Sequence, residues 1–379
     1  MAQTVARVDL SILIENIDLV RNRVPRGMKV LFAVKSDAYG HGIEEISRSA
    51  EAAGIDYLGV DTVDEGVEIR SAGIKLPILL LAPILPCEID RALQSDLTPS
   101  IGDIDSARLI ANRARGMGRR ASVQVNVDTG MGRFGARVDR GVALFERLSQ
   151  VGDLTVEGVF SHLSFAESET SEAREHSLLQ IERFRTLLAS LDDAHLLPSL
   201  RHIGNSASLI QFPQSILSAP FNMVRIGTLL YGYPEVRRPS IDGVRPIAKL
   251  SAYVLFVKDL PIGACVGYDC TYRTTEAKRI AVVSIGYGSG LSPTFSGCGR
   301  VYVRGEYAPV VGRICLDHTI IDVSHVRNVA PGDEVEIFGP HQGADQLASL
   351  AGISICQLLV PTLQAAKERT YLRGRKELS

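Results

Sequence analysis

Between residues 11 and 240, short apolar segments alternate with segments in which apolar residues recur every three or four positions. The first pattern predicts β-strands and the second predicts amphipathic helices. Strands are expected over residues 29–34, 55–61, 77–82, 97–101, 122–128, 155–163, 200–205 and 223–227. Helices are expected between them, for example over 11–24, 43–53, 64–73, 103–115, 137–150 and 171–192, with a short last helix near 206–212. Strands that alternate with helices pair in parallel, so this pattern favours an α/β TIM barrel, a (β/α)8 barrel, over the alternative of a doubly wound open sheet.

The sequence changes character after about residue 240. Strand-like segments there follow one another with glycine-rich turns between them, which predicts a second, mostly-β C-terminal domain. Its expected strands cover 249–258, 279–285, 300–304, 308–315, 318–323 and 334–338. A short helical tail should follow, with Asp345 as its N-cap and the stretch 354–369 behind it. The segment 237–246 is the predicted linker.

The composition argues against several classes of protein. A formal charge of −2, without a Lys/Arg-rich block, argues against a nucleic-acid partner. The longest apolar run, 76–86, contains three prolines and is far shorter than the ~20 residues that span a bilayer. The N-terminus lacks the layout of a signal peptide. The six cysteines include no CxxC pair and are expected to be buried, small apolar residues in a reducing compartment. We therefore expect a cytoplasmic protein with no membrane partner and no metal site.

Lys35 is the first candidate for chemistry. It ends the apolar stretch Val30–Val34 and begins the polar, glycine-containing run KSDAYGHG. A lysine at the end of a buried strand can serve as a Schiff-base nucleophile or as a proton carrier. It can equally be a side chain whose charged end reaches solvent. The local residues leave both interpretations open.

Further polar residues fall at the ends of later predicted strands, where the chemistry of such a barrel gathers. They are Arg133 in VDTGMGRFG, His162, His202 with Asn205 and Ser206 in RHIGNSAS, and Arg225 with Gly227 in MVRIGT. Each has an ordinary structural explanation, such as a tight turn, a packed histidine or a buried arginine with a carboxylate partner. Their convergence on one face of a barrel nevertheless predicts a ligand pocket.

The residue types in this set suggest an anionic ligand. Asn205, Ser206 and the backbone near Gly227 could hold a phosphate. Arg133 could bind a carboxylate through two hydrogen bonds. A lysine together with a phosphate site and a carboxylate site points to pyridoxal 5'-phosphate and an amino acid.

Several of these segments resemble the alanine racemase family. The run AVKSDAYGHG is similar to the pyridoxal-lysine motif of that family. The segments VDTGMGRFG, RHIGNSAS, MVRIGTLLYG, VGYDCTY, SIGY and VGRICLDHT match further family segments in the same order. The resemblance extends from the first predicted helix to about residue 340.

The resemblance implies two domains: a barrel over residues 11–240 that binds pyridoxal phosphate, and a β-rich domain over 241–379 that also takes in an N-terminal strand within 1–10. It further implies a head-to-tail homodimer, in which each active site combines the barrel of one subunit with the β-rich domain of the other.

It also implies a role for each site residue. Lys35 would carry the cofactor, and Tyr268 would be the second acid/base, reaching in from the partner subunit. The cofactor phosphate would be surrounded by Tyr39, Asn205, Ser206, Gly227 and Thr228. Arg225 would face the pyridine nitrogen, while Arg133 would contact the phenolic oxygen and the substrate carboxylate. His162 and His202 would position Tyr268 and Arg225. The entrance and the substrate pocket would be lined by Tyr287, Leu316 and Asp317.

The chain departs from the family pattern at several places. Asn126 stands where the family commonly has a carbamylated lysine, so a bound anion such as chloride is the hypothesis for the missing negative charge. Leu316 replaces a usual methionine, Gln364 aligns with a tyrosine that usually contacts the phosphate, and GYGSG replaces GYADG. These changes surround the substrate and the phosphate, so they bear on specificity more than on the type of reaction.

The leading hypothesis is a pyridoxal-phosphate racemase that acts on alanine and supplies D-alanine for peptidoglycan. A serine racemase or a broader racemase is the closest alternative. A barrel-type decarboxylase would need an acidic residue at the pyridine nitrogen, where MVRIG offers Arg225. A non-enzymatic, cofactor-binding homeostasis protein of the single-barrel type would not need the β-rich domain with Tyr268.

Overall fold

The computed structural model describes residues 4–236, 241–374 and 376–378. The chain forms two compact units. The barrel unit consists of Ile14–Ala38 and Ile43–Val244, and the β-rich unit consists of the chain up to Leu13, Tyr39–Gly42 and the chain from Arg245 onward. The first part of the predicted linker, 237–240, and the first three residues of the N-terminal strand segment lie outside the described residues.

The barrel unit contains two arcs of parallel strands. One arc has the order β11-β2-β3-β4-β5 and the other β6-β7-β9-β10. The strands of the first arc are β11 (Met223–Ile226), β2 (Lys29–Ala33), β3 (Tyr57–Val60), β4 (Ile78–Leu80) and β5 (Leu97–Thr98). Those of the second are β6 (Ser100–Ile101), β7 (Ala121–Asp128), β9 (Leu154–Phe160) and β10 (Leu200–His202), with the short β8 (Ala136–Arg137) beside β7.

The two arcs join at both ends into a closed barrel. At one junction, β5 continues into β6 through Pro99, whose carbonyl accepts a 3.0 Å hydrogen bond from Gln124 N. At the other, Arg225 N donates to Gly204 O at 2.9 Å and links β11 to the end of β10. This closure confirms the predicted barrel and rules out the open sheet. The predicted strand 97–101 is split because Pro99 has no N–H for the ladder.

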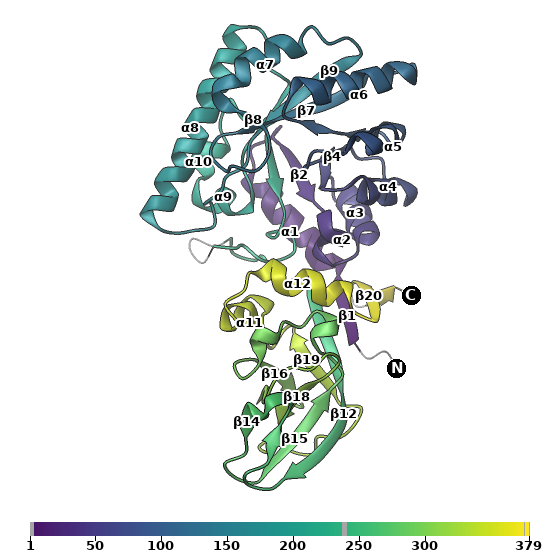
Figure 1. The fold of residues 1–379 in the computed structure, drawn as a ribbon, viewed down its shortest axis with the longest axis vertical. Helices are drawn as coiled ribbons and strands as arrows, with labels where there is room; N and C mark the ends of the chain where they lie inside the picture. The colour runs from purple at the N-terminus through teal and green to yellow at the C-terminus, as the bar shows by residue number, and fades with distance from the viewer. Residues whose placement is uncertain (1–3, 237–240, 375, 379) are drawn as a thin grey trace. The chain divides into compact units, whose positions relative to one another are not determined.

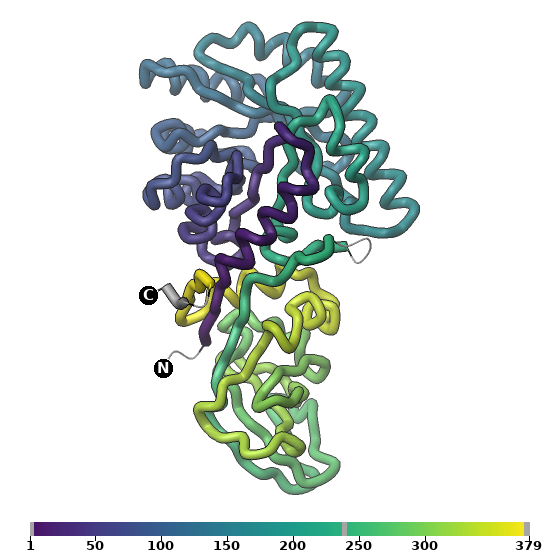
Figure 2. The backbone as a smooth tube through the Cα atoms, turned by 180° about the vertical axis from the view of Figure 1, so that it is seen from behind, coloured from purple at the N-terminus to yellow at the C-terminus, as the bar shows by residue number. Residues whose placement is uncertain are grey.

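Helices cover the outside of the strands (Figure 1). They are α1 (Leu10–Arg23), α3 (Ile43–Ala52), α4 (Val63–Ser71), α5 (Ile89–Gln94), α6 (Ile104–Gly116), α7 (Gly141–Leu148), α8 (Ser171–Asp193), α9 (Ser206–Gln211) and α10 (Pro213–Ile216). The long helix α8 lies at the outer edge of this unit in both views (Figures 1 and 2). Its apolar stripe includes Phe184, Leu188 and Leu191, each at most 1% exposed, as the three- and four-residue spacing predicted.

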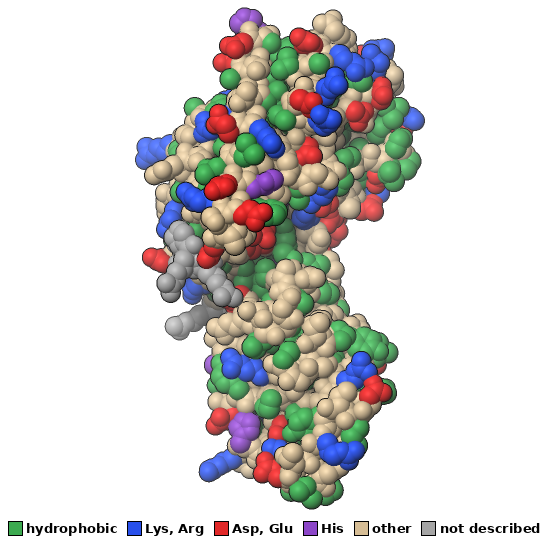
Figure 3. All heavy atoms as spheres, turned by 60° about the vertical axis from the view of Figure 1, so that its left-hand side comes forward, with side chains coloured by type: hydrophobic (Ala, Val, Ile, Leu, Met, Phe, Trp, Pro, Cys, Tyr) green, Lys and Arg blue, Asp and Glu red, His purple; other side chains and the backbone are tan. Residues whose placement is uncertain are grey.

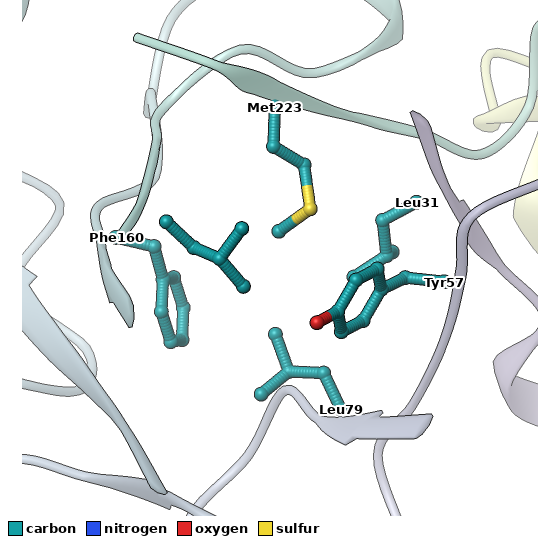
Figure 4. Close-up of a cluster of buried hydrophobic side chains, with 6 residues drawn as sticks. Leu31, Tyr57, Leu79, Phe160 and Met223 are labelled. Atoms are coloured by element: carbon teal, nitrogen blue, oxygen red, sulfur yellow. The ribbon is translucent and has the colours of Figure 1, made fainter. Parts of the chain in front are cut away.

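The interior of the barrel is filled with side chains. Six of them, each from a different strand and each at most 8% exposed, form one cluster: Leu31, Tyr57, Leu79, Phe160, Leu200 and Met223. Figure 4 shows their side chains pointing toward one another. Burying a large apolar side chain contributes roughly 1.5–3 kcal/mol. This packed layer closes the barrel from within, so a ligand can enter only at an end.

The β-rich unit is built on one large sheet. The path of its strands is β17-β16-β19-β12-β1-β20-β21, with β15 paired to β12 and β18 paired to β15. The central strand β12 (Ala248–Leu260) pairs antiparallel with β1 (Thr4–Asp9), which pairs parallel with β20 (Glu368–Arg373). The others are β15 (Lys278–Val283), β16 (Arg300–Val303), β17 (Glu306–Pro309), β18 (Thr319–Asp322), β19 (Glu334–Phe338) and β21 (Lys376–Leu378), with a small hairpin of β13 (Cys265–Val266) and β14 (Tyr272–Arg273).

The helical tail differs from the prediction. Helix α11 (Ala344–Leu350) has Gly343 as its N-cap, so Asp345 lies inside the first turn. Helix α12 (Ile355–Gln364) ends at Gln364 rather than continuing to 369. The following residues form β20, because pairing with β1 outweighs the local helical pattern.

The prediction of buried cysteines is wrong. Cys265 and Cys270 form a disulfide, with their Cα atoms 4.9 Å apart. Cys87 and Cys298 are exposed, and Cys315 and Cys356 are partly buried. The short hairpin of β13 and β14 brings the first pair together. The sequence did not reveal this contact, because the two cysteines are five residues apart and do not form a CxxC pair.

Within the described ranges, no single helix is long and apolar enough to cross a membrane, although the bent pair α11 and α12 would pass on length and composition alone. Acidic and basic side chains are interspersed on the face shown in Figure 3.

Candidate active site

Lys35 stands at the carboxyl end of β2, directly after the buried residues Val30–Val34. The four residues that follow, Ser36 to Tyr39, all have left-handed backbone conformations, with φ between 52° and 55°. Residues with a Cβ pay roughly 1–2 kcal/mol each for this conformation. Such strain is typical of functional sites, where the surroundings must enforce it. One enforcing contact is a 2.8 Å hydrogen bond from Ile43 N to Asp37 Oδ1.

Arg225 lies in β11 and is only 6% exposed. Its Nη1 donates to His202 Nδ1 at 2.8 Å, and its Nη2 donates to His162 Nδ1 at 3.0 Å and to Ser161 O at 2.7 Å. The guanidinium also lies 5.3 Å from the centre of the Phe160 ring. These contacts hold a cation at the end of the barrel, and none of them is made by a carboxylate.

The tautomers of the two histidines follow from this network. Each Nδ1 accepts from Arg225, so the proton of each ring must reside on Nε2. For His202, Nε2 lies 2.8 Å from Gln124 Oε1 and donates to it. Burial, followed by the charge of Arg225, lowers the pKa of His202 well below 6.5. Burial, followed by the charges of Arg225, Arg133 and Lys35, lowers the pKa of His162 to about 3. Both rings are therefore neutral acceptors at neutral pH.

The network continues to the far side of Gln124, whose Nε2 donates to Glu157 Oε1 at 2.9 Å. Burial raises the pKa of Glu157, although the bond from Gln124 opposes the shift. Burial, with a smaller effect of Arg133, lowers the pKa of Arg225 to about 9, so the guanidinium stays protonated at neutral pH. Gln124 and Glu157 lie within strands of mixed pattern and carried no sequence signal for this role.

The candidate phosphate cradle lies at the ends of β10 and β11. Gly227 N donates to Ser206 Oγ at 2.9 Å, so two of its expected members contact each other. Asn205 Oδ1 accepts a 2.9 Å hydrogen bond from Ser208 N and caps α9. The oxygen therefore serves the helix, and the expected contact with a phosphate would fall to the amide nitrogen of this side chain. Thr228 is 4% exposed, and its hydroxyl has no hydrogen bond of good geometry among the described residues. The hydroxyl nevertheless interacts with the carboxylate of Glu235, whose pKa this contact lowers while burial and the nearby charge of Glu167 raise it to about 7.

Arg133 belongs to a turn that one carboxylate organises. Asp128 Oδ1 accepts hydrogen bonds from Gly130 N at 2.9 Å and Met131 N at 2.8 Å, and both of its oxygens accept from Gly132 N. Burial alone would raise the pKa of Asp128, but these backbone N–H groups lower it. A small cavity beside the turn is lined by Asn126, Arg133 and His162, among others. The structure thus brings the neutral amide and the predicted carboxylate-binding arginine together.

The β-rich unit presents its own set of candidates. Tyr268 is 66% exposed and Tyr287 is 48% exposed, and both line a cavity of about 790 Å³. Backbone hydrogen bonds from Tyr287 N to Cys315 O at 3.0 Å and from Gly288 N to Leu316 O at 2.7 Å place Leu316 beside Tyr287. Leu316 is 52% exposed, Asp317 is exposed, and Gln364 is exposed at the end of α12.

Two contacts constrain the loop that carries Tyr268. The Cys265–Cys270 disulfide spans it, and Asp269 forms an ion pair with Arg313. Asp269 and Cys270 have φ values of 56° and 48°, in the left-handed region. Neither the disulfide nor this ion pair was predicted from the sequence.

Comparison with known proteins is consistent along the whole chain. The family model described as alanine racemase, N-terminal domain, matches residues 8–235, and the one described as alanine racemase, C-terminal domain, matches residues 247–371. A protein of Syntrophobacter fumaroxidans named alanine racemase is 37% identical over 360 residues, which cover 93% of each chain. One of Cutibacterium acnes with the same name is 37% identical over 353 residues, 92% of each chain.

Solved structures agree with these relatives. Alanine racemase of Clostridium difficile 630 superposes with a TM-score of 0.90 at 29% identity, covering 100% of this chain and 98% of the other. Alanine racemase from the D-cycloserine-producing Streptomyces lavendulae gives a TM-score of 0.89 at 31% identity, covering 99% and 98%. The chain therefore belongs to the alanine racemase family.

Proposed function

We propose that this protein interconverts L- and D-alanine with pyridoxal 5'-phosphate as its cofactor. The observation that carries the proposal is Arg225, a cation held by two neutral histidines at the end of β11 in a chain of this family. A barrel-type decarboxylase would need an acid at that position, which disfavours this alternative.

The residues of the barrel unit fit the cofactor. The amine of Lys35 stands at a strand end, and the hydroxyl of Thr228 is buried within the candidate cradle. Together with Ser206, Gly227 and Asn205, these groups would hold the cofactor and its phosphate, and the family pattern adds Tyr39, four residues after Lys35. Arg225 would lie at the pyridine nitrogen, and Arg133 at the phenolic oxygen and the substrate carboxylate.

The chemistry requires a proton to leave one face of the α-carbon and return to the other. Bound pyridoxal phosphate supplies an electron-withdrawing ring that makes this proton acidic. Lys35 Nζ would hold the proton on one face and Tyr268 Oη on the other. Because Arg225 keeps its own proton, it would leave the pyridine nitrogen of the bound cofactor unprotonated. This would weaken the electron sink and limit side reactions such as transamination.

We propose the same organisation of the chain as the family pattern implies. The barrel domain would cover residues 11–240, and the β-rich domain would cover 241–379 with a strand from 1–10. Two copies would form a homodimer in the cytoplasm, each supplying Tyr268 to the other, and D-alanine would go to peptidoglycan. Tyr287, Leu316 and Asp317 would line the entrance and the substrate pocket.

The alternative is a racemase that prefers serine or accepts a broader range of amino acids. Leu316 favours this alternative, because it stands where the family usually has a methionine. Its exposed position beside Tyr287 is compatible with contact to a substrate side chain. Asn126, beside Arg133, supports an anion such as chloride as the source of negative charge, and a crystal without an anion peak there would argue against it.

The direct test measures loss of optical rotation with L-alanine, L-serine and a panel of other L-amino acids. We expect alanine to give the highest kcat/KM, and borohydride reduction followed by peptide mapping to locate the cofactor at Lys35. Tyr268→Phe should abolish racemisation while the cofactor absorbance persists. Tyr302→Phe, a change of the same kind elsewhere in the β-rich unit, is the control. Racemisation that survives in Tyr268→Phe would refute the two-base assignment.

A further inference from the structure

Lys35 has an ionic partner inside the barrel unit. Its Nζ lies 3.1 Å from Asp61 Oδ2. The reason lies in strand register: β2 and β3 are parallel, with Ala33 opposite Gly59, so two residues further along each strand Lys35 stands opposite Asp61. A hydrogen bond of 2.8 Å from Val34 N to Gly59 O extends the pairing toward this end. The carboxylate therefore comes from the neighbouring strand end.

A third residue fixes the two strand ends to each other. Glu65 Oε2 accepts from Asp61 N and Thr62 N, each at 3.2 Å, and Glu65 Oε1 accepts from Ser36 N. Glu65 and Thr62 also form the capping box of α4. One carboxylate thus holds the backbone beside the lysine and the backbone of Asp61, so the position of Asp61 relative to Lys35 is built into the fold.

Lys35, the partner of Asp61, belongs to a group of three positively charged residues. Arg225, Arg133 and Lys35 all act on His162, where their positive charges add to burial in lowering its pKa. Asp61 introduces a negative charge next to the amine in this cationic surrounding. Its side chain is 40% exposed and that of Lys35 is 30% exposed, so water reaches both.

Building on the proposed function, we propose that Asp61 is a positioning residue for Lys35. It holds the ammonium at the strand end whenever the amine is not bonded to the cofactor. An ammonium paired in this way keeps one orientation, so Nζ can deliver a proton to the same face of the α-carbon in every turnover. Without the carboxylate, the flexible lysine side chain samples other rotamers and loses this orientation.

The first test uses the full chain freed of cofactor, because the pair can then be examined without turnover. Trinitrobenzenesulfonate is added in small excess, and the modification of Lys35 is followed by peptide mass spectrometry. In Asp61→Asn we expect Lys35 to react about three- to tenfold faster, because its side chain is then no longer held at the strand end and meets the reagent more often. Asp61→Glu should restore slow labelling in part.

Asp64→Asn is the matched control. It removes a carboxylate three residues along, whose side chain is 79% exposed and paired with Arg91 instead of Lys35. Lys35 labelling in this variant should equal that of the unmodified protein. Equal labelling in Asp61→Asn and Asp64→Asn would overturn the inference, whatever the racemase assay shows.

The second test uses the holoenzyme and substrate deuterated at the α-carbon. Asp61→Asn should lower kcat about tenfold and raise the isotope effect in the one direction in which Lys35 takes the proton. A merely structural defect would change both directions alike, and that outcome would refute the positioning role. If the unmodified protein racemises no amino acid, the proposed function fails, but the labelling experiment still decides whether Asp61 holds Lys35.

Discussion

The guanidinium of Arg225 donates a 2.8 Å hydrogen bond to Nδ1 of His202, and this bond fixes the proton of the histidine on Nε2. His202 donates this proton in a 2.8 Å hydrogen bond to Gln124 Oε1. The ring of Phe160 stacks on the histidine ring, with 5.1 Å between the two centroids. His162 accepts from the same guanidinium at 3.0 Å. Burial, together with this charged group, keeps two histidines neutral, and the histidines in turn hold that charge in place.

The first prediction concerns the pH dependence of stability. His162, with a folded pKa of about 3, and His202, with a folded pKa well below 6.5, should take up protons near pH 6.5 once the chain unfolds. The unfolded chain then binds more protons below pH 6.5, so the stabilisation is complete above that pH and is lost as the pH falls toward 3. Each histidine should contribute a slope of up to about 1.4 kcal/mol per pH unit.

Urea unfolding of the unmodified protein and of His162→Gln between pH 7.5 and 4.5 measures this slope. In His162→Gln, the slope of the free energy of unfolding against pH should be smaller by the contribution of one histidine. His195→Asn changes an exposed histidine and should leave the slope unchanged. Equal slopes for the unmodified protein and His162→Gln would contradict the assignment of a neutral His162.

The second prediction concerns the disulfide near Tyr268. Denatured protein purified without reductant should show four reactive thiols, and reduction should bring the number to six. Closing a loop this short contributes about 2 kcal/mol in the chain-entropy description. The pair of changes Cys265→Ser and Cys270→Ser should therefore lower the free energy of unfolding by about that amount, and it should speed amide exchange over 265–272.

Cys298→Ser removes an exposed free thiol and is the control for this pair. Six reactive thiols before reduction would show that the disulfide does not form in the purified protein.

The third prediction concerns Gly290, the last residue of GYGSG. Its φ is +82°, and a Cβ there would lie 2.4 Å from the backbone carbon of Pro361. Gly290→Ala therefore combines left-handed strain with a clash against α12, and it should cost about 3 kcal/mol or more. Gly305, at φ +91°, has open space around its Cβ position, so Gly305→Ala should cost only roughly 1–2 kcal/mol. Urea unfolding of both variants provides the comparison, and similar costs would refute the clash.

The sequence predicted the elements whose signal is local. Apolar runs and helical spacing located the barrel strands within a few residues, and the lysine after Val34 marked the end of the first one. Signals that depend on tertiary pairing were missed. The segment after Gln364 has helical spacing but becomes β20, because β1 pairs with it. Asp61 became visible only through strand register, and the Cys265–Cys270 pair only through a hairpin of two-residue strands.

The site shows the same division. Residues carried by distinctive motifs, such as Arg225 and His162, come together in the barrel unit as expected. Gln124 and Glu157, which complete the network, look like ordinary strand residues in the sequence. Helix α5 lies between two predicted strands, where a helix was expected, but its bounds could not be predicted because its six residues are too few for a clear period.

The last prediction tests whether active sites are shared between subunits. Lys35→Ala and Tyr268→Phe should each be inactive alone. If Tyr268 serves the site of the partner, a mixed dimer of the two variants has one site with both residues intact and one with neither. Random mixing makes half of the dimers mixed, so the mixture should regain about a quarter of the unmodified activity.

Tagging each variant differently allows the mixed dimer to be purified, and its activity per dimer should then be about half that of the unmodified protein. If each site used Lys35 and Tyr268 of one chain, every subunit in the mixture would lack one of the two groups. No mixing ratio would then restore activity, and the head-to-tail dimer would have to be abandoned while the racemase chemistry of the single chain remained.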